Sequence, residues 1–288
     1  METSPVLGIL GGSGLYAMQN AIQVEVVELD TPFGNPSSSV VIGDLNGKRF
    51  AFIARHGEGH IYSPAEVNYR ANIYAMKMLG VKHLISVSAC GSLREDYAPG
   101  DIVVPDQLFD RTEGRHRSFF GDGLVAHVNV ADPFCPVLSN RLVKSVEESG
   151  GVVHDSGTFI TIPGPRFSTK AESNTYRAWG MSIIGMTCSP EAFLAREAEM
   201  CYASMAHVTD YDVWHTTEEP VTVERIIQTL QANTKLAQSA IALLLEQHTE
   251  EWECDCGDAL KDALITNPEF IPSDTRRRLS ILVERYLS

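Results

Sequence analysis

The stretch HLISVSACGS, residues 83–92, decides the fold of this chain. It is an apolar run that ends in small residues, which indicates a buried strand. The preceding stretch, SPAEVNYRANIYAMKMLG at 63–80, predicts a helix, with Ser63 as the N-cap of a capping box and Gly80 as the stop. GDIVVP at 100–105 predicts the next strand. Strands that alternate with helices indicate a mostly parallel sheet with helices on both faces.

The same alternation continues along the rest of the chain. Further strands are expected at 6–10, 23–29, 39–43, 49–54, 157–162, 182–187 and 201–209, and further helices at 137–149, 169–179, 189–200, 221–247 and 273–287. Asn46-Gly47 predicts a hairpin between two of the early strands, which makes the sheet mixed. The expected fold class is therefore α/β, a single domain with a mixed, largely parallel central β-sheet flanked by helices. The domain is expected over residues 1–250, with residues 251–288 as a helical extension packed on it.

Composition and charge limit the classes of partner. With 288 residues, of which 44% are hydrophobic, the chain can bury a large core. The formal net charge of −14 at pH 7 argues against sequence-independent binding to nucleic acid or to an anionic membrane. The N-terminal stretch METSPVLGILGG lacks the basic flank of a secretory signal, and no apolar run is long enough to span a membrane. With six scattered cysteines, these features predict a cytoplasmic protein with mostly reduced thiols.

Cys254 and Cys256 form a C-x-C pair near the end of the chain. A structural zinc site needs four ligands, and no two further ligands lie near this pair in the sequence. Free thiols are therefore expected, with a redox-active or stabilising disulfide as the alternative, and no metal site is predicted.

Polar or glycine-rich stretches follow many of the expected strands. They are GGSG (11–14), ARHG (54–57), SACGS (88–92), PGPRFS (163–168), GMTC (185–188) and TDYD (209–212). Ligands of such folds lie beyond the carboxyl ends of the strands, so we expect these stretches to meet. The groups that would together hold an anion are the backbone N–H groups of GGSG, Ser13, Arg55, His56, Ser88 and Thr187. Taken singly, each has an ordinary alternative: a common turn, a surface arginine, a satisfied core histidine or a hydroxyl bonded to backbone.

Asp210 and Asp212 lie in TDYDVW (209–214), directly after the apolar run MCYASMAHV. In an extended chain, side chains at positions i and i+2 project to the same side, so the two carboxyls would share one small space. Burial and the nearby second acid make it harder for both to be ionised, which raises the pKa of one of them. The pair therefore suits a group that holds a proton at neutral pH, although an N-capping or surface pair is the commoner fate of an Asp-x-Asp motif.

Several of these stretches are specific in combination. They are GILGGSG, ARHGEGH, SPAEVNYRANI, SACGSLREDYAPGDIVVPDQLFDRT, IPGPRFST, GMTCSPEAFLAREAEMCYA and TDYDVW. Over roughly residues 5–247 the chain resembles the methylthioadenosine phosphorylase branch of the purine nucleoside phosphorylase family. That resemblance implies an α/β fold with a mixed sheet, usually assembled as trimers, that splits the N-glycosidic bond of a purine nucleoside with inorganic phosphate. Phosphate would be a co-substrate, and no further cofactor is expected.

The resemblance also implies roles for individual residues. Positions that match the family's phosphate ligands are Ser13, Arg55, His56, Ser88, the backbone of Ala89, and Thr187. Positions that match nucleoside-binding residues are Phe167, Met186, Asp210, Tyr211 and Asp212, with Ser168 and Val223 linked to the choice of 5′-substituent and His127 reaching into the site of a neighbouring subunit. Ser13 and Ser88 depart from the family, which often has threonine there, so the hydroxyl is kept but its position changes.

The reaction implied is phosphorolysis of 5′-methylthioadenosine to adenine and 5-methylthioribose 1-phosphate. Asp210 would donate to purine N7, and Asp212 would orient it or accept from the 6-amino group, which favours adenine over a 6-oxo purine. An apolar 5′ pocket of Phe167, Val223 and Ile226 would favour methylthioadenosine over adenosine. The last two residues are equally typical of a core stripe.

Other functions stay open at this stage. One is a phosphorylase for 6-oxo nucleosides such as inosine or methylthioinosine, against which an aspartate at position 210 argues. Another is a purine-binding module without turnover, which would need no phosphate beneath the sugar. A dinucleotide or nucleotide-sugar enzyme rests on GGSG alone. The expected partners are the nucleoside, phosphate and further copies of the chain, assembled as a trimer or a hexamer.

Overall fold

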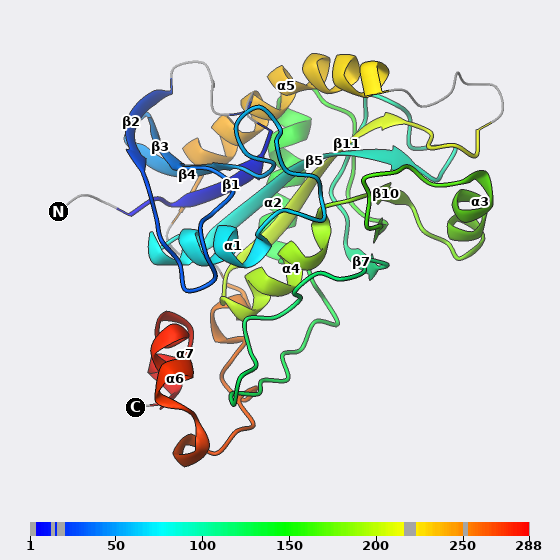
Figure 1. Ribbon diagram of the computed structural model, residues 1–288. Coiled ribbons are helices and arrows are strands. Elements are labelled where there is room, and N and C mark those ends of the chain that lie inside the picture. Colours follow the sequence, from blue (N-terminus) through cyan, green and yellow to red (C-terminus); the bar gives the residue numbers. More distant parts are fainter. Residues whose placement is uncertain (1–3, 13–14, 16–20, 216–222, 250–252, 288) are drawn as a thin grey trace.

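A long central strand organises the computed structural model, which describes the chain except residues 1–3, 13–14, 16–20, 216–222, 250–252 and 288. This strand, β5 (His83–Ser92), covers the residues expected for it. It runs beside β11 (Cys201–Asp210) through the middle of the molecule (Figure 1). Both strands are apolar along most of their length because both faces of the sheet are covered.

The other elements alternate along the chain much as expected. The strands are β1 (Leu7–Gly11), β2 (Ile22–Val27), β3 (Val40–Leu45), β4 (Lys48–Ala54), β6 (Ile102–Val103), β7 (Gln107–Asp110), β8 (Val153–His154), β9 (Thr158–Thr161) and β10 (Ile183–Gly185). The helices are α1 (Tyr69–Met78), α2 (Pro136–Glu148), α3 (Lys170–Ala178), α4 (Cys188–Glu197), α5 (Val223–Glu246), α6 (Ser273–Arg278) and α7 (Ser280–Leu287), with short 3-10 turns η1 (Asp255–Asp258) and η2 (Pro268–Phe270). The predicted α/β class, one mixed sheet flanked by helices, is confirmed.

In the part of the chain that the structure describes, the sheet has 11 strands of mixed direction. Its main path runs β2-β3-β4-β1-β5-β10-β9-β7, and β11, β6 and β8 continue from the other edge of β5. β1 pairs in parallel with β4 and β5, and β11 also pairs in parallel with β5. β3 and β4 form the predicted hairpin, in which Asn46 and Gly47 have φ angles of 53° and 81°. Positive φ at both turn residues is what the hairpin turn favoured by Asn-Gly requires.

Strand β10 runs against β5, which changes where the strand ends meet. Ile183 and Ile184 pair antiparallel with Ser92 and Gly91, while β9 and β7 follow β10 in parallel. We expected the polar stretches beyond the carboxyl ends of the strands to meet, and those after β1 and β10 do, although β9 and β10 run in the opposite direction to β5. Because these strands are reversed, their carboxyl ends point back toward the carboxyl ends of β1 and β4.

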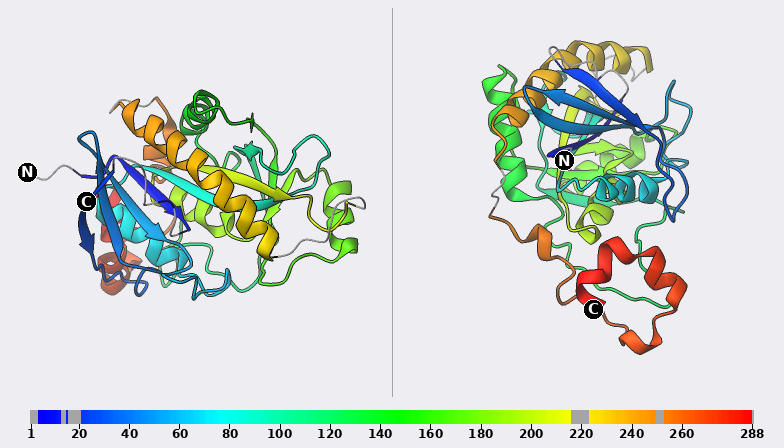
Figure 2. Two further views of the ribbon diagram at one scale, coloured as in Figure 1. Left: turned by 90° about the horizontal axis from the view of Figure 1, so that it is seen from above. Right: turned by 90° about the vertical axis from the view of Figure 1, so that its left-hand side faces the viewer.

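Helices cover both faces of the sheet (Figures 1 and 2). α2 and α5 pack against each other and against β11, and Leu138, Leu142 and Leu244 belong to the apolar core on that side. α1 and α4 pack together on the other side, where Ile73 and Leu194 belong to a second core. Among the described residues, no helix is both long enough and apolar enough to cross a membrane.

Helix α1 begins later than predicted. Part of the expected capping box forms, since the backbone N–H of Ser63 donates to Oε2 of Glu66 at 3.0 Å, but it closes only an isolated turn. The helix starts after Asn68, whose side chain accepts from the N–H of Ala71 and donates to the carbonyl of Phe33 at 2.7 Å. Asn68 therefore caps the helix in place of Ser63, and its bond to the distant Phe33 holds the capping side chain in position.

Two other predicted helices differ in their outcome. The capping box of Thr169 and Glu172 is confirmed at the start of α3. The helix expected over 273–287 is interrupted at Leu279, so α6 and α7 are separate short helices. Leu279 and Val283 are both fully buried in the core that also contains α1 and α4 residues.

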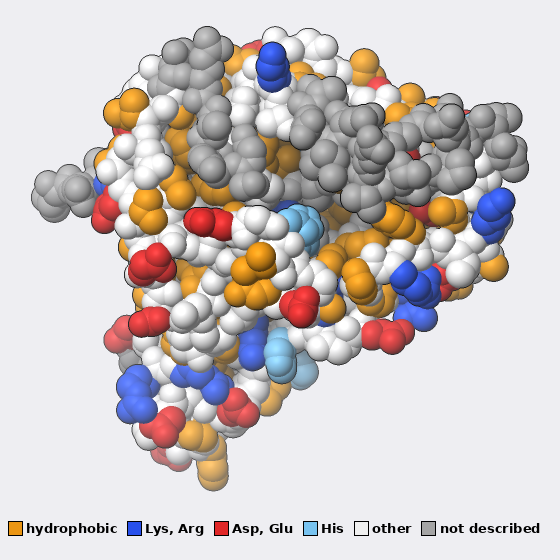
Figure 3. All heavy atoms as spheres, turned by 45° about the horizontal axis from the view of Figure 1, so that its top comes forward, with side chains coloured by type: hydrophobic (Ala, Val, Ile, Leu, Met, Phe, Trp, Pro, Cys, Tyr) orange, Lys and Arg blue, Asp and Glu red, His pale blue; other side chains and the backbone are white. Residues whose placement is uncertain are grey.

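The C-terminal segment, defined here as residues 253–287, lies on the side of α1 and α4 (Figure 1). The hydroxyl of Tyr74 donates to the carbonyl of Arg278 at 2.8 Å. Oε1 of Glu199 accepts from the hydroxyl of Tyr286 at 2.5 Å and from the N–H of Leu260 at 3.0 Å. On the face drawn in Figure 3, charged side chains of both signs are interspersed.

Candidate active site

A stretch of unpaired strand edge lies at the centre of the sheet, where β1 and β10 approach each other. β11 pairs along one edge of β5 over nearly its full length. On the other edge, β1 pairs with residues 84–86 and β10 with residues 91–92. Among the described residues, no strand pairs with residues 87–90 of β5 on that edge, and we call this stretch the β5 gap. The carboxyl ends of β1 and β10 face the gap from opposite directions.

Ser88 and Ala89 lie in the β5 gap, as a phosphate site at these positions requires. The hydroxyl of Ser88 is buried and makes no hydrogen bond, although buried hydroxyls normally find a partner. Gly11 and Gly185 flank the gap. A Cβ atom added to Gly11 would lie 3.5 Å from the carbonyl oxygen of Val87, and one added to Gly185 would lie 3.5 Å from that of Ala89. These distances show that the ends of β1 and β10 lie close to the gap.

Thr187 is buried at the N-cap of α4, two residues after the end of β10. Its side chain makes no capping hydrogen bond, so it does not satisfy the first N–H groups of the helix. Ser189 has φ and ψ angles of −96° and 133°, so α4 is kinked there and Thr187 lies in a turn before its regular part. Ser13, the remaining hydroxyl predicted to bind phosphate, follows β1 and lies outside the described residues.

Arg55 follows β4 and is only 2% exposed, so the alternative of a surface arginine is wrong. Its Nε donates to Oε1 of Glu191 at 2.5 Å, and Nη1 donates to the carbonyl of Val87 at 3.0 Å. Nη2 donates to the hydroxyl of Ser86 at 2.6 Å and to the carbonyl of Leu10 at 3.1 Å. A guanidinium has five N–H donors. The contacts above use the Nε donor, both Nη2 donors and one Nη1 donor, so the second Nη1 donor remains for an anion. The bidentate fork toward phosphate expected from the sequence is not formed.

Glu191 is a site residue that the sequence reasoning missed. It is fully buried in α4, where it pairs with Arg55 and accepts from the hydroxyl of Tyr202 at 3.0 Å. A buried carboxylate is tolerated only with such partners. An acid inside the otherwise apolar stretch CSPEAFLA was therefore the available signal for a buried basic partner.

His56 is half-buried next to Arg55. Its Nδ1 lies 2.9 Å from the carbonyl oxygen of Tyr62, and its ring stacks on that of His60 with centroids 4.3 Å apart. Because a carbonyl only accepts, Nδ1 carries the proton of the neutral ring. Burial, with the charge of Arg55, lowers the pKa of His56 to about 4, so Nε2 is unprotonated at neutral pH. In the free site, His56 is therefore an acceptor at Nε2, whereas the sequence predicted a donor.

Asp210 and Asp212 share one space, as expected, beside Gly91 and the far end of the β5 gap. Oδ1 of Asp210 accepts from the N–H of Asp212 at 2.8 Å, and Oδ2 accepts from the hydroxyl of Thr209 at 2.7 Å. A Cβ at Gly91 would lie 3.0 Å from Oδ1 of Asp210 and 3.2 Å from the Cβ of Asp212. The reason given for this proximity is wrong, because Asp212 has a φ of 50° and follows the strand in a turn.

The two acids differ in their surroundings. Oδ2 of Asp212 is buried without a hydrogen-bond partner. Burial, together with the charge of Asp210, raises the pKa of Asp212 above its usual value. The pair thus contains one carboxyl whose protonated form is favoured, which is the property predicted for it.

Arg115 is a second residue that the sequence reasoning missed. Its Nη1 donates to the carbonyls of Met186 at 2.7 Å and Ser189 at 2.6 Å, and its Nη2 donates to that of Pro163 at 2.9 Å. These contacts join the stretch after β9 to the stretch after β10 and position Met186. Its partners are backbone carbonyls 48 to 74 residues away, so no local pattern could have revealed this role.

The residues predicted to contact the nucleoside lie on several of these stretches. Phe167 is 38% exposed, and the hydroxyl of Ser168 is buried without a partner. Tyr211 packs on the ring of His215, with centroids 4.6 Å apart. Val223 begins α5, but its side chain and that of Ile226 lie outside the described side chains.

His127 is exposed in the long connection between β7 and α2. Its backbone N–H donates to the carbonyl of Ala263 at 2.9 Å, and the adjacent Ala126 forms a bridge with Leu264. These contacts hold the connection against the C-terminal segment and not against the β5 gap. Any role of His127 in a neighbouring subunit's site stays a prediction.

The match to a known family covers the whole of this arrangement. The family model of the phosphorylase superfamily matches residues 6–246, from β1 to the end of α5. The β5 gap, the buried Arg55–Glu191 pair and the two acids all lie inside this range. The chain therefore belongs to the phosphorylase superfamily.

Within that superfamily, the chain falls among the S-methyl-5′-thioadenosine phosphorylases. It is 53% identical over 286 residues to the S-methyl-5′-thioadenosine phosphorylase of Chloroflexus aurantiacus, covering 99% of each chain. It is 51% identical over 259 residues to that of Thermofilum pendens, covering 90% of this chain and 98% of the relative.

Solved structures agree with this placement. A methylthioadenosine phosphorylase from an antarctic soil metagenomic library matches with a TM-score of 0.93 and 46% identity, covering 97% of this chain and 99% of that one. Methylthioadenosine phosphorylase from Schistosoma mansoni in complex with adenine matches with a TM-score of 0.84 and 36% identity, covering 89% and 96%.

Proposed function

We propose that the chain catalyses phosphorolysis of 5′-methylthioadenosine, which releases adenine and 5-methylthioribose 1-phosphate, with inorganic phosphate as the co-substrate. The observation that carries the proposal is the β5 gap, which holds the unbonded hydroxyl of Ser88 and ends beside a pair of acids. The relatives support the substrate, since the Schistosoma mansoni enzyme was solved with adenine and a mutant of it with methylthioadenosine.

Phosphate is assigned to the β5 gap, between Ser88 and Thr187. The hydroxyl of Ser88, the hydroxyl of Thr187 and the remaining Nη1 N–H of Arg55 supply donors. Nε2 of His56 supplies an acceptor, because the pKa of this residue is lowered to about 4 by burial. The monohydrogen phosphate dianion carries one O–H, so we expect that hydroxyl toward His56 and the bare oxygens toward the donors. Holding the anion in this way replaces an improbable encounter with the sugar carbon.

The purine is assigned to the Asp210–Asp212 end of the gap. As the bond between C1′ and N9 breaks, the purine gains negative charge, which a hydrogen bond or proton at N7 neutralises. Asp210 is assigned to N7 and Asp212 to the 6-amino group. Both oxygens of Asp210 accept hydrogen bonds within the protein, whereas Oδ2 of Asp212 is unbonded. Separate Asn variants of the two acids therefore decide how the roles are divided.

The 5′-methylthio group is assigned to the side formed by Phe167, Ser168 and Val223. A thioether needs no strong donor, and the exposed ring of Phe167 offers apolar contact. We therefore expect a higher kcat/KM for methylthioadenosine than for adenosine.

The test of the proposed function is incubation of the protein with methylthioadenosine, with and without phosphate, while free adenine is measured. Release of adenine only when phosphate is present supports phosphorolysis. Adenosine and methylthioinosine are the comparison substrates, and a higher kcat/KM for either would contradict the assigned substrate. Nucleoside binding by calorimetry without cleavage would indicate a purine-binding module instead.

We also propose a homo-oligomer, a trimer or a hexamer, located in the cytoplasm. His127 is exposed, and its stretch contacts the C-terminal segment, which supports a contribution to a neighbouring subunit. Light scattering gives the assembly mass. Mixing His127→Ala subunits with Asp210→Ala subunits tests the shared site, since hybrids should regain activity that neither variant has alone. A fully active monomer would contradict the proposal.

A further inference from the structure

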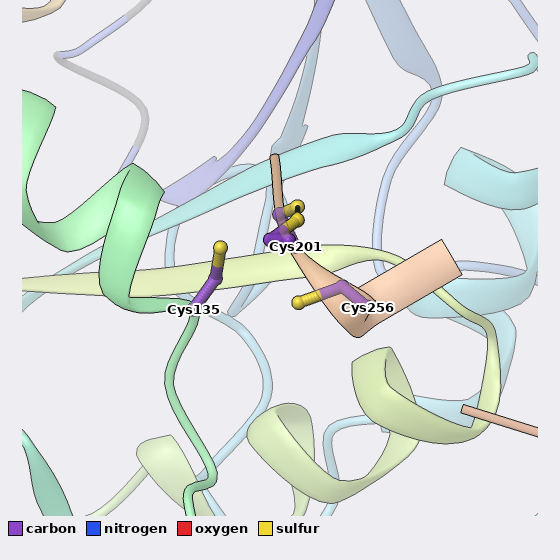
Figure 4. Close-up of side chains that lie close together, drawn as sticks. Cys135, Cys201 and Cys256 are labelled. Atoms are coloured by element: carbon purple, nitrogen blue, oxygen red, sulfur yellow. Dashed lines mark hydrogen bonds between the residues drawn. The ribbon is translucent and has the colours of Figure 1, made fainter. Parts of the chain in front are cut away.

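Four cysteines converge where the C-terminal segment leaves the core (Figure 4). They are Cys135, Cys201, Cys254 and Cys256, and their Sγ atoms all lie within 4.8 Å of one another. We call this group the cysteine cluster. The premise that the C-x-C pair has no two further ligands nearby is therefore wrong in the folded chain. The sequence did not reveal it because the nearest of the other two, Cys201, is 53 residues from Cys254.

Each cysteine is held by a different structural element. Cys135 is the N-cap of α2, and Cys201 is the first residue of β11. Cys254 directly precedes η1, and Cys256 lies inside it. The labelled sulfurs in Figure 4 point toward a common centre from α2, β11 and the C-terminal segment. The cluster thus joins one helix and one strand of the core to the segment that follows α5.

The spacing of the sulfurs suits a metal ion better than a disulfide. The Sγ atoms of Cys201 and Cys254 are 3.4 Å apart, and all six cysteines of the chain are free. A disulfide requires about 2.0 Å between sulfurs. Four sulfurs arranged tetrahedrally at about 2.3 Å from a zinc ion are about 3.8 Å apart. That value lies between the 3.4 Å contact and the 4.8 Å limit of the cluster.

The surroundings of the cluster offset the negative charge that a four-thiolate site carries. The backbone N–H of Leu138, in the first turn of α2, donates to Sγ of Cys135 at 3.5 Å. Nη1 of Arg196 donates to Sγ of Cys256 at 3.4 Å. Contacts of this kind orient metal ligands, and the positive end of α2 adds a favourable field.

Burial also matches a closed, structural site. Cys135, Cys201 and Cys256 are 2%, 5% and 4% exposed, so the cluster leaves little access for water or substrate. Catalytic zinc sites keep a position open for water, whereas structural sites use four protein ligands. The other two cysteines, Cys90 and Cys188, are buried elsewhere in the α1 and α4 core and provide internal controls.

We propose that the cysteine cluster binds one Zn²⁺ ion in a tetrahedral, four-thiolate site that fastens the C-terminal segment to the core. The ion would tie η1 to the start of α2 and the start of β11. It would thereby support the contacts of Tyr74 and Glu199 with the same segment. This inference is independent of the proposed function, because the site holds no substrate.

The first experiment measures metal content in the full-length protein by plasma mass spectrometry. We expect one zinc ion per subunit in the unchanged protein and in Cys90→Ala. The double variant Cys254→Ser/Cys256→Ser should lose the zinc. Removing the ion with a chelator should lower the Tm of the unchanged protein by several degrees, and Zn²⁺ alone should restore it.

The second experiment replaces zinc with Co²⁺ in the unchanged protein and records its absorption spectrum. Tetrahedral thiolate ligation predicts intense sulfur-to-cobalt charge-transfer bands and visible d–d bands. This measurement uses the unchanged protein, so it tests the site even if the double variant does not fold. The proposal is overturned by protein that contains no zinc and gives no such bands. It is equally overturned by zinc that persists in the double variant, or by disulfides within the cluster in peptides mapped without reduction.

Discussion

The polar groups on the two walls of the β5 gap, the rear wall and the front wall, differ in whether they are hydrogen-bonded within the protein. Behind the gap, Arg55 and Glu191 form a buried ion pair whose oxygens and most of whose N–H groups are bonded inside the protein. At the front, the hydroxyl of Ser88 and Oδ2 of Asp212 are buried without partners among the described residues. Folded proteins normally satisfy buried polar groups, so unbonded ones in the gap are available to a ligand. Changes behind the gap should therefore cost stability, and changes at the front should cost activity.

The largest effect is expected from breaking the rear wall with Glu191→Ala. This change leaves the charge of Arg55 buried and unpaired, which should lower the free energy of unfolding by about 3–5 kcal/mol. Urea unfolding followed by circular dichroism measures the loss. The double variant Arg55→Met/Glu191→Leu removes both charges and should recover most of it. A double variant as unstable as the single one would show that the ion pair is not the cause.

At the front wall, Asp210→Ala should reduce kcat/KM for methylthioadenosine by about 10²–10⁴-fold, the usual contribution of a general acid. Its free energy of unfolding should fall by no more than about 3 kcal/mol, because the carboxyl accepts two hydrogen bonds of at most about 1.5 kcal/mol each. Asp210→Asn keeps a donor but loses the acid, so we expect the preference to shift toward 6-oxo nucleosides. A near-normal rate in Asp210→Ala would show that the acid pair does not take part in catalysis.

A third prediction concerns a buried proton site outside the gap. His207 in β11 is 1% exposed, and neither of its ring nitrogens has a hydrogen-bond partner. Burial lowers its pKa from 6.5 to about 4, so the folded state favours the neutral ring. The stability linked to this residue is therefore complete above pH 6.5 and is lost as the pH falls toward 4. The expected loss is about 3 kcal/mol.

The measurement is the difference in unfolding free energy between the unchanged protein and His207→Leu across this pH range. Taking the difference between the two proteins isolates His207, because the contribution of Glu197, which changes with pH in the opposite direction, is present in both and cancels. Burial raises the pKa of Glu197 from 4.5 to about 7, so its contribution is lost as the pH rises through that range. A difference that does not vary with pH would contradict the prediction.

The smallest effect is expected from Ser88→Ala. Its hydroxyl bonds nothing within the protein, so the free energy of unfolding should change by less than about 0.5 kcal/mol. The KM for phosphate should rise about tenfold, equivalent to about 1.4 kcal/mol. Ser86→Ala is the matched control, because that hydroxyl accepts from Arg55 and should affect stability more. The prediction would be contradicted if Ser88→Ala lowered the stability and Ser86→Ala raised the KM for phosphate.

Local signals predicted the elements whose boundaries depend on neighbouring residues. β5, the Asn46-Gly47 hairpin and the capping box at Thr169 all follow from short patterns. The start of α1 did not, because Asn68 is held by the carbonyl of Phe33. The direction of β10 could not be predicted from the sequence either, because it depends on the pairing of β10 with β5, which is far away in the chain.

The site was predicted in part for the same reason. Polar residues in the carboxyl-terminal halves of apolar strands, such as Ser88 and Asp210, were identified from their place in the sequence. The partners of Arg55 were not, because its guanidinium bonds Glu191 far along the chain and so faces the interior. Arg115 left no signal at all, since its partners are backbone carbonyls.

The amino-acid sequence by itself determined the α/β class and the residue types that follow each strand, because strand and helix patterns are local and the chemistry of a side chain does not depend on the fold. Only the tertiary structure decided that β1 and β10 meet head to head across the β5 gap. It also brought Cys135 and Cys201 to the C-x-C pair of the C-terminal segment. The physical reason is that pairings between distant residues are selected by the packing of the whole core, and no short stretch of sequence contains that information.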